Sequence, residues 1–466
     1  MRISRFGGVA AIAALLSSCG GGSSGNNNTG GSPTPTPTSS GSATCSFASR
    51  ASWTLSQLEE WYLFPDLLDS GADASAYSDL QDYIDALVAP ARAANRDRFF
   101  TYVTSIAEEN AYYSSGANAG FGFRLGYDTV NDRVFVIETY EGTPALGNNI
   151  DRGSEIRAIG PDEASMQSIR IIMSAGGPQA VINALGPNTA GVTRAIRVID
   201  ASGIDRTVTI AKEEYDLDPV SDRYGAKIIS DGGKQVGYIN LRSFIGPANA
   251  DLTQAFADFR AAGVTELIID QRYNGGGAIS VAEHFGDLMA RDLDGEVFDR
   301  IAFRDSKASN NTAYRLNAQA ESIAPTKIAF ITRPGTASAS EMVINGMLPH
   351  VADIALIGEN TYGKPVGQIA EDLSACDDRL RIVALKVENA DGQGDYYDGL
   401  LDFVPDSCRA SDDISAQLGD PDEAMVAAGG PQLHGHRCRR GQGGGRRGAR
   451  TAPARTAERR AGLRAG

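Results

Sequence analysis

Segments typical of strands and of helices alternate along the second half of the chain, and this alternation limits the possible folds more than any other feature. Short apolar runs predict strands over 236–241, 266–271, 327–332 and 354–358. Amphipathic segments predict helices over 250–262, 278–290 and 338–348. Strands that alternate with helices form βαβ units and a mainly parallel sheet. Functional residues of such sheets collect in loops at the carboxyl ends of the strands, which here are 273–277, 333–338 and 359–364.

The length and composition of the chain indicate a multidomain globular protein. A chain of 466 residues is too long for one hydrophobic core and predicts two or three domains. The formal net charge is −15, but residues 429–466 hold ten Arg against Glu458 alone, so the rest of the chain carries −24. An acidic folded part argues against a nucleic acid as partner, because phosphate binding needs clustered Lys and Arg.

Residues 1–19 have the pattern of an export signal. Two arginines precede a short apolar run over 9–16, and this run is too short to span a bilayer. It ends in Leu16-Ser17-Ser18-Cys19, which resembles the lipobox of bacterial lipoproteins and implies cleavage before Cys19 and lipidation of its thiol. A plain secretory signal is the alternative. We expect a lipid-anchored protein on the periplasmic face of the bacterial cell envelope, with the outer membrane favoured.

Two further segments have low complexity. Residues 20–44 are rich in Gly, Ser and Asn and contain a Pro-Thr alternation, which is typical of a flexible spacer stiffened by proline. Residues 429–466 combine dense Arg and Gly with few apolar side chains, so they cannot bury a core. A basic interaction arm is one interpretation of this tail. An out-of-frame reading of GC-rich coding sequence is the other, and we favour it.

The cysteines bear on the compartment and on the fold. Export would place Cys45, Cys376, Cys408 and Cys438 in an oxidising compartment, where disulfides persist. Four cysteines allow three connectivities. Cys376 and Cys408 flank one predicted strand-loop-strand unit, so we favour that pair.

Two domains are predicted upstream of the alternating region. Residues 45–116 carry aromatic and apolar side chains at helical spacing, and stripes of this kind usually form a core, so this part is predicted to be a small helical domain. Residues 117–215 change to strand periodicity. They contain Gly120-Phe121-Gly122-Phe123, followed by Gly-Thr-Pro-Ala at 142–145 and Gly-Ser-Glu-Ile at 153–156. Together these segments resemble a PDZ domain of the kind found with bacterial proteases.

The resemblance to PDZ domains implies a peptide-binding role for the Gly-Phe-Gly-Phe turn. Backbone N–H groups of Gly120, Phe121, Gly122 and Phe123 would bind the terminal carboxylate of a peptide that adds a strand beside them. Taken alone, Gly-x-Gly is more often an ordinary hairpin. Ser154 stands where these domains usually have Asp, which is a minor departure.

Several common catalytic motifs are absent from the sequence between the spacer and the tail. His284 and His350 are the histidines there, neither neighbours a plausible nucleophile, and we expect both to be structural. No Gly-x-Ser-x-Gly, His-Glu-x-x-His or Cys-x-x-Cys occurs in that part, which argues against a histidine-based triad and a zinc site. The segment 358–364 has P-loop spacing, but Pro365 follows where Ser or Thr must ligate Mg²⁺. We therefore expect neither metal nor nucleotide as cofactor.

Lys364 is a candidate general base. A free lysine titrates at about 10.4 and is protonated at neutral pH. Desolvation disfavours the charged form and can lower the pKa to roughly 7–8, where the neutral amine accepts a proton from a serine. A side-chain amide at Gln368 can orient this amine without a carboxylate charge, which would raise the pKa again.

Ser338 is a candidate nucleophile at the start of a predicted helix. Ser338-Ala-Ser-Glu341 also fits a capping box, and most serines in that pattern only cap helices. A helix N-terminus nevertheless offers free N–H groups and the positive end of a dipole. The N–H of Ala339 can therefore help to hold an oxyanion, a contribution of about 3 to 4 kcal/mol per donor. The glycines at 275–277 would supply the second donor, since glycine lets a backbone approach a substrate closely.

Three blocks of the sequence together resemble the signatures of the C-terminal processing peptidases, the tail-specific proteases with a Clp protease/crotonase-like core. The blocks are Asp270-Gln-Arg-Tyr-Asn-Gly-Gly-Gly277, Gly335-Thr-Ala-Ser-Ala-Ser-Glu341 and Gly358-Glu-Asn-Thr-Tyr-Gly-Lys364. The resemblance covers residues 53–428, with the helical segment and the PDZ-like domain where that family has them. Gln271 stands where the family more often has Leu, and the tail departs from the family entirely.

The resemblance implies a role for each matching residue. The family's serine falls on Ser338 and not on Ser340, its lysine on Lys364 and its glutamine on Gln368. Its oxyanion donors fall on the N–H group of Ala339 and on that of either Gly275 or Gly276. The implied activity is cleavage of polypeptides that present an accessible C-terminal tail to the PDZ domain.

The sequence thus predicts a multidomain α+β protein with a helical segment, a PDZ-like β domain and an α/β protease core over 216–428. The predicted function is that of a serine endopeptidase without cofactor. A non-catalytic PDZ-type scaffold that binds peptides in the cell envelope is the alternative, and the presence of Ser338, Lys364 and Gln368 argues against it. Another hydrolase or an acyl transferase on the same core is a third possibility.

Overall fold

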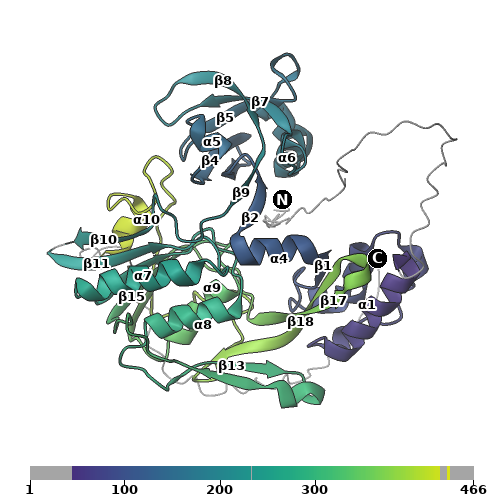
Figure 1. Ribbon diagram of the computed structural model, residues 1–466, viewed down its shortest axis with the longest axis vertical. Helices are drawn as coiled ribbons and strands as arrows, with labels where there is room; N and C mark the ends of the chain where they lie inside the picture. The colour runs from purple at the N-terminus through teal and green to yellow at the C-terminus, as the bar shows by residue number, and fades with distance from the viewer. Residues whose placement is uncertain (1–44, 232, 431–437, 441–466) are drawn as a thin grey trace, which may run out of the picture.

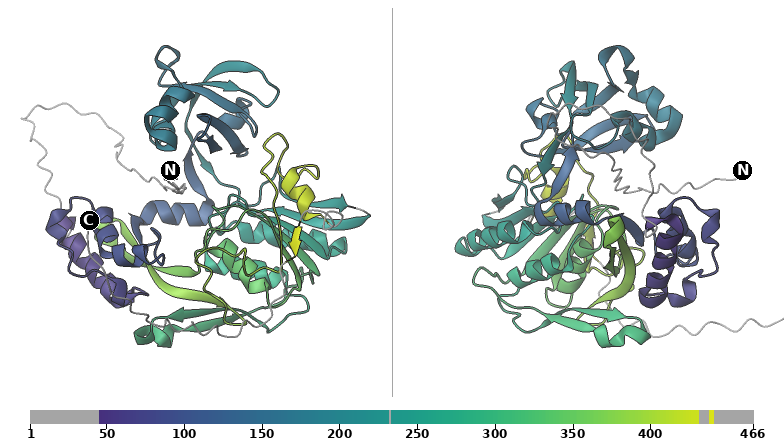
Figure 2. Two further views of the ribbon diagram at one scale, coloured as in Figure 1. Left: turned by 180° about the vertical axis from the view of Figure 1, so that it is seen from behind. Right: turned by 45° about the vertical axis from the view of Figure 1, so that its right-hand side comes forward.

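The computed structural model describes residues 45–231, 233–430 and 438–440. The expected signal peptide with Cys19, the spacer over 20–44 and most of the basic tail lie outside the described residues. Figures 1 and 2 show a large α/β core, a group of helices at one side of it, and a β domain that projects from the core on two strands. No helix of the described part of the chain is both long and apolar enough to cross a membrane.

A seven-stranded sheet forms the centre of the core. Its strands lie in the order β10-β11-β12-β15-β16-β19-β20, in which the pairs from β11 to β19 are parallel and the two outer pairs are antiparallel. In chain order their bounds are Ala226–Asp231, Lys234–Asn240, Glu266–Asp270, Lys327–Thr332, Asp353–Gly358, Asp406–Cys408 and Cys438–Arg440. The four strands predicted from apolar runs and their parallel pairing are confirmed.

Helices cover both faces of this sheet. Three of them pack on one face through a large apolar cluster, namely α7 (Ala248–Ala261), α8 (Ile279–Leu288) and α9 (Ala339–Met347). On the opposite face lies α10 (Ala424–Gly429), where Met425 and Val426 join a smaller cluster. The three helices predicted between the strands are confirmed to within two residues at each end.

A second, antiparallel sheet lies beside the core and was not predicted. Its strands lie in the order β1-β18-β13-β14, and β17 forms a hairpin with β18. In chain order they are β1 (Tyr102–Ser105), β13 (Val297–Phe303), β14 (Thr312–Arg315), β17 (Val366–Leu373) and β18 (Asp378–Asn389). This sheet joins strands from the N-terminal segment to strands from the core.

The N-terminal helices pack against the β17–β18 hairpin. These helices are α1 (Phe47–Trp61), α2 (Leu80–Leu87) and α3 (Ala89–Ala93), and α4 (Ile106–Ser115) follows β1. One apolar cluster contains Leu58, Tyr83 and Ile84 from the helices and Val366, Ile382 and Val383 from the hairpin. The segment is helical as predicted apart from β1, and its core is shared with the strand that directly follows Lys364.

The β domain is joined to the core by β2 (Ala117–Gly120) and β9 (Glu213–Asp216), which pair with each other. Figure 1 shows the domain above α4 at the end of these two strands. Its sheet has the order β3-β4-β5-β7-β8, with β6 paired to β5. Their bounds are Phe123–Asp128, Arg133–Thr139, Glu155–Gly160, Thr193–Ile199 and Asp205–Ala211, with β6 at Gln167–Ser168 and helices α5 (Pro144–Gly147) and α6 (Ile169–Leu185).

A disulfide joins Cys45 to Cys376, whose Cα atoms are 5.5 Å apart. The predicted Cys376–Cys408 pair is therefore wrong. Cys376 lies in the 3₁₀ turn at the tip of the β17–β18 hairpin, whereas Cys408 ends β19 of the seven-stranded sheet. The two strands between these cysteines, β18 and β19, belong to different sheets and do not form the single unit that the prediction assumed.

A buried network of charges connects the β domain to the core. The carboxylate of Asp412, in the loop after β19, accepts hydrogen bonds from Arg152 of the β domain at 2.6 Å, from Arg272 at 3.0 Å and from Arg333 at 2.9 Å. The Tyr273 hydroxyl donates to it as well. Burial would raise the pKa of the Asp412 carboxyl, but the arginines and Tyr273 lower it to about 2. Asp412 therefore holds three separate parts of the chain together.

We expect Asp412→Asn to lower the free energy of unfolding at pH 7 by roughly 3 kcal/mol or more, because it leaves the buried guanidinium of Arg152 without its carboxylate partner. The folded pKa of about 2 lies below the ordinary value of about 3.9. The ionic contribution is therefore complete above about pH 4 and is lost as the pH falls toward 2. Urea unfolding of both proteins at pH 7 and at about pH 2.5 checks this, and the difference between them should be smaller at the lower pH. Asp413→Asn is the control, and equal stability of wild type and Asp412→Asn would contradict the prediction.

Candidate active site

Three loops meet at the carboxyl edge of the seven-stranded sheet. In the parallel register Asp270 of β12 pairs with Ile331 of β15, and Thr332 of β15 pairs with Gly358 of β16. The three strands therefore end at the same edge, and the loops that follow them cover 271–278, 333–338 and 359–365. The location predicted for the unusual residues of these loops is confirmed.

Ser338 lies where the loop after β15 enters α9. Its φ of 57° and ψ of −119° fall in a region that residues other than glycine rarely adopt, so its backbone is strained. Ser338 is partly exposed, whereas every residue of α9 is buried. Ser340 is one of those buried residues, and its hydroxyl donates to the Asn274 carbonyl at 3.1 Å. Of the two serines in this block, Ser338 has the accessible hydroxyl.

The glycine turn after β12 packs directly against Ser338. Gly276 has a φ of 107°, and a Cβ atom there would lie 2.7 Å from Ser338 Cβ and 2.9 Å from the Ala337 carbonyl oxygen. The N–H of Gly276 donates to Asn274 Oδ1 at 2.8 Å. By contrast, the N–H groups of Gly275 and Ala339 have no acceptor among the described residues. Of the predicted oxyanion donors, Gly275 and Ala339 are therefore available and Gly276 is engaged.

Lys364 and Gln368 are hydrogen bonded to each other. Lys364 Nζ donates to Gln368 Oε1 at 2.7 Å, and Gln368 Nε2 donates to the Phe100 carbonyl. Burial lowers the pKa of Lys364 to about 8, although Asp97 and Glu341 oppose the shift. Both Ser338 and Lys364 are described, and no hydrogen bond joins Ser338 Oγ to Lys364 Nζ.

Glu341 connects the serine loop to the lysine loop. Its Oε2 accepts the N–H of Ser338 at 3.0 Å and the N–H of Lys364 at 2.7 Å, and its Oε1 accepts the N–H of Gly363 at 2.6 Å. The sequence pattern predicted only the first of these bonds, as part of a helix cap. In a P-loop, backbone N–H groups of this segment would point at a phosphate. Here the N–H groups of Gly363 and Lys364 donate to the Glu341 carboxylate. This agrees with the rejection of a nucleotide site at 358–364.

Residues of the N-terminal segment complete the surroundings of Lys364, and sequence reasoning assigned them only to packing. Arg98 donates to the carbonyls of Tyr362 and Gly363, at 2.6 Å each. The Phe100 ring lies 5.0 Å from Lys364 Nζ. The Asp97 carboxylate accepts the N–H of Phe100 at 2.8 Å and fixes this turn. The sequence offered one signal for this role, which is the presence of Asp97 and Arg98 among the aromatic residues of this segment.

The four predicted peptide-binding residues lie where the chain enters the β domain, with Phe121 and Gly122 in the turn between β2 and β3. Gly122 has a φ of 83°, and a Cβ atom there would clash with Thr143. The carbonyls of Phe121 and Gly122 accept N–H groups of Ala145 and Tyr140, at 2.9 Å each. The N–H groups of Phe121 and Gly122 have no acceptor within the described part of the chain. Gly120 ends β2, and Phe123 begins β3, which is an edge strand of its sheet.

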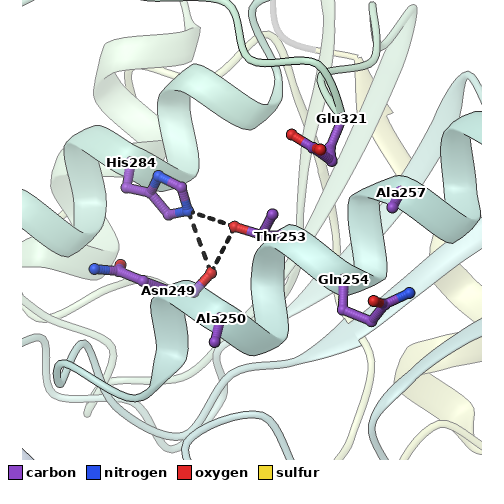
Figure 3. Close-up of a pocket in the computed structure, with 7 residues that line it drawn as sticks. All are labelled: Asn249, Ala250, Thr253, Gln254, Ala257, His284 and Glu321. Atoms are coloured by element: carbon purple, nitrogen blue, oxygen red, sulfur yellow. Dashed lines mark hydrogen bonds between the residues drawn. The ribbon is translucent and has the colours of Figure 1, made fainter.

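Both histidines have local partners, as predicted. His284 Nε2 lies 2.9 Å from Thr253 Oγ1 and 3.3 Å from the Asn249 carbonyl oxygen. Figure 3 shows His284, Thr253 and Asn249 among the residues that line a pocket between α7 and α8. His350 Nε2 lies 2.9 Å from the Val297 carbonyl oxygen. Within residues 45–231, 233–430 and 438–440, no three His, Cys, Asp or Glu side chains are grouped so that they can hold a metal ion.

Comparison with known proteins finds one family that the core resembles. The sequence model of the family described as Peptidase family S41 matches residues 235–396. The chain is 23% identical over 262 residues to a carboxyl-terminal-processing protease of Synechocystis, covering 56% of each chain. It is 25% identical over 269 residues to the chloroplastic C-terminal processing peptidase of Tetradesmus obliquus, covering 56% of this chain and 54% of the relative. The chain thus spans about half the length of the curated relatives it matches.

A solved structure agrees with the fold. A crystal structure from Bacteroides fragilis, named as a candidate S41 protease, superposes with a TM-score of 0.61 at 22% sequence identity. The match covers 81% of this chain and 95% of that one. At this identity the likeness supports the mixed α/β multidomain fold and no finer conclusion.

The contact between Gly276 and Ser338 generates a prediction. We expect Gly276→Ala to slow the labelling of Ser338 by a fluorophosphonate about a hundredfold, because the new Cβ must displace the serine by a large part of an ångström. Mass spectrometry of the labelled peptide measures the rate. Gly335→Ala is the matched control, since a Cβ atom at Gly335 meets nothing within 4 Å. Equal labelling of the two variants would show that the turn does not position the serine.

Proposed function

We propose that the chain is a serine endopeptidase that cleaves polypeptides with Ser338 as nucleophile and Lys364 as general base, in keeping with the match of residues 235–396 to the model of peptidase family S41. The observation that carries the proposal is the environment of Lys364. Its amine has a pKa lowered to about 8, a neutral amide as hydrogen-bond partner, and a backbone held by the same carboxylate oxygen as the backbone of Ser338.

The proposed reaction runs in two steps. Ser338 Oγ attacks the carbonyl carbon of the scissile bond while neutral Lys364 Nζ takes the hydroxyl proton. Collapse of the tetrahedral intermediate breaks the C–N bond, and Lys364 returns the proton to the leaving amine. A water molecule then attacks the acyl-enzyme with Lys364 again as base, which releases the acid and restores Ser338. The missing Ser338–Lys364 hydrogen bond fits this scheme, because such bonds often tighten only when substrate binds.

The N–H groups of Gly275 and Ala339 are the proposed oxyanion donors. Both are without an acceptor among the described residues, and Ala339 is the first residue of α9, where the positive end of the helix dipole favours negative charge. Gly276 contributes by its lack of a side chain, since its N–H is engaged by Asn274. The oxyanion therefore forms between the glycine turn and the start of α9.

We propose that the β domain acts as a PDZ-like domain and binds the C-terminal tail of the substrate. The free N–H groups of Phe121 and Gly122 suit a carboxylate, and β3 has an unpaired edge to which a peptide can add as a strand. Substrates would then be polypeptides with an accessible C-terminus.

The proposed location is the periplasmic face of the cell envelope, with Cys19 as lipid anchor and 20–44 as spacer. The Cys45–Cys376 disulfide supports export, because disulfides are rare in reducing compartments. Globomycin, which blocks lipoprotein signal cleavage, would make the unprocessed form accumulate in a bacterial host if the proposal is right.

We expect Ser338→Ala and Lys364→Ala each to lower kcat by at least about a thousandfold with little change in thermal unfolding. In the wild type, kcat should rise with pH and reach half of its plateau value at about pH 8, because Lys364 must be neutral and its pKa is lowered to about 8. Hydrolysis of an unfolded polypeptide, followed by fluorescence from pH 5.5 to 10, measures both effects.

Ser340→Ala and Lys386→Ala are the matched controls for these variants. Ser340 is a buried serine two residues from Ser338, and Lys386 is a partly exposed lysine on β18. Both controls should keep most of the activity. Full turnover by Ser338→Ala or Lys364→Ala would exclude the proposed chemistry. Tight peptide binding by a wild-type protein that neither cleaves nor reacts with fluorophosphonate would favour a non-catalytic scaffold.

Tail recognition is tested with two substrates of identical sequence, one with a free C-terminal carboxylate and one with a C-terminal amide. We expect the amide to raise KM about tenfold or more, because a charge-assisted hydrogen bond contributes about 1.5–3 kcal/mol. Acetylation of the N-terminus serves as the control and should leave KM unchanged. If amidation has no effect on cleavage, carboxylate binding by the β domain is wrong while the serine chemistry stands.

A further inference from the structure

Glu341 is a buried acid whose contacts exceed those of a helix cap. Its exposed fraction is 0%, and its carboxylate accepts the N–H groups of Ser338, Gly363 and Lys364. The Thr361 side chain also hydrogen bonds to it. One carboxylate thus receives four hydrogen bonds, one from the serine end of α9 and three from the loop that carries the lysine.

The donors around Glu341 require the ionised carboxylate. A carboxylate only accepts hydrogen bonds, whereas a carboxylic acid would direct its own proton at one of the N–H groups. Burial raises the pKa of the Glu341 carboxyl, and the hydrogen bonds from Thr361, Lys364, Gly363 and Ser338 oppose that shift. Hydrogen bonds from several backbone N–H groups favour the charged form of a buried acid.

Resting on the proposed function, we propose that Glu341 is the positioning residue that holds the nucleophile loop and the base loop in one geometry. Ser338 and Lys364 belong to different loops, and Oε2 of Glu341 accepts the backbone N–H of both. The same bond to Ser338 holds a residue whose φ is 57°, and strained residues of this kind persist only where their surroundings fix them. Misplacement of reacting groups by about 1 Å can cost a hundredfold in rate.

The negative charge of Glu341 also acts on Lys364, and this gives a readout that a purely structural role would lack. The charged groups that act on the lysine are Asp97 from the turn before β1, Glu341 from α9 and Arg381 from β18. The two acids favour the protonated amine, and Arg381 disfavours it. Removal of the Glu341 charge must therefore make Lys364 lose its proton at a lower pH.

The test compares two substitutions at this position. Glu341→Gln keeps one acceptor oxygen but turns an NH₂ group toward backbone donors and removes the charge. Its kcat should fall about ten- to a hundredfold, and the rising limb of its pH profile should move to lower pH by at least about half a unit. Glu341→Asp keeps the charge on a side chain that is too short to reach both loops. Its kcat should also fall, while the rising limb stays near that of the wild type.

Glu359→Gln is the control, because Glu359 is an exposed acid at the start of the same lysine loop, and it should leave kcat and the pH profile unchanged. Fluorophosphonate labelling of Ser338 normalises each rate to the folded, reactive fraction. If Glu341→Gln does not fold, Glu341→Asp alone tests the inference. Its kcat should be lowered while the rising limb of its pH profile stays near that of the wild type.

The inference would be overturned if either Glu341 variant had the kcat of the wild type. It would also be overturned if Glu341→Gln had a lowered kcat but the rising limb of its pH profile did not move. Failure of the proposed function itself looks different. In that case the wild type would neither cleave polypeptides nor be labelled at Ser338.

Discussion

The parallel pairing of β12, β15 and β16 is the constraint on which the site depends. Each strand is buried on both faces, with Ile328 and Phe330 of β15 toward α7, α8 and α9, and Ala329 and Ile331 toward α10. A shift of one residue would exchange the two faces of a strand, so the register is strongly specified. The register in turn fixes where each strand ends, and the three functional loops begin at those ends. Sheet packing therefore determines the position of residues that take no part in the core.

The surroundings of the lysine depend on a different kind of contact. Lys364 opens the β17–β18 hairpin, and that hairpin is covered by the N-terminal helices. Arg98 reaches the lysine loop from 264 residues away in the chain, and the disulfide joins residues 331 apart. Folding of the site therefore requires that the N-terminal segment be in place, even though this segment supplies no proposed catalytic side chain.

The elements that were predicted correctly are those that local sequence patterns specify. Apolar runs and helical spacing gave the strands and helices of the parallel sheet, and glycines, Ser338 and Lys364 marked the loops at its edge. The antiparallel sheet was missed, because its strands carry mixed apolar and polar residues, and because β18 pairs with β1 and β13, which are distant in the chain. The disulfide was predicted wrongly for the same reason. Gln271 is 0% exposed and neither of its amide atoms has a partner among the described residues, and nothing in the structure explains its presence there.

The charges near Lys364 give a physical reason for a glutamine at position 368. Burial lowers the pKa of the amine, whereas Asp97 and Glu341 raise it, and the result is about 8. Both acids are committed elsewhere, Asp97 to the turn that contains Phe100 and Glu341 to the two loops. A carboxylate at 368 would add a third negative charge, in direct contact with the amine, and would raise the pKa of the lysine again. The amide accepts the same hydrogen bond without that charge. Asp97 and Glu341 can therefore accept backbone N–H groups near Lys364 without keeping its pKa high, because the amide of Gln368 that contacts the amine is neutral.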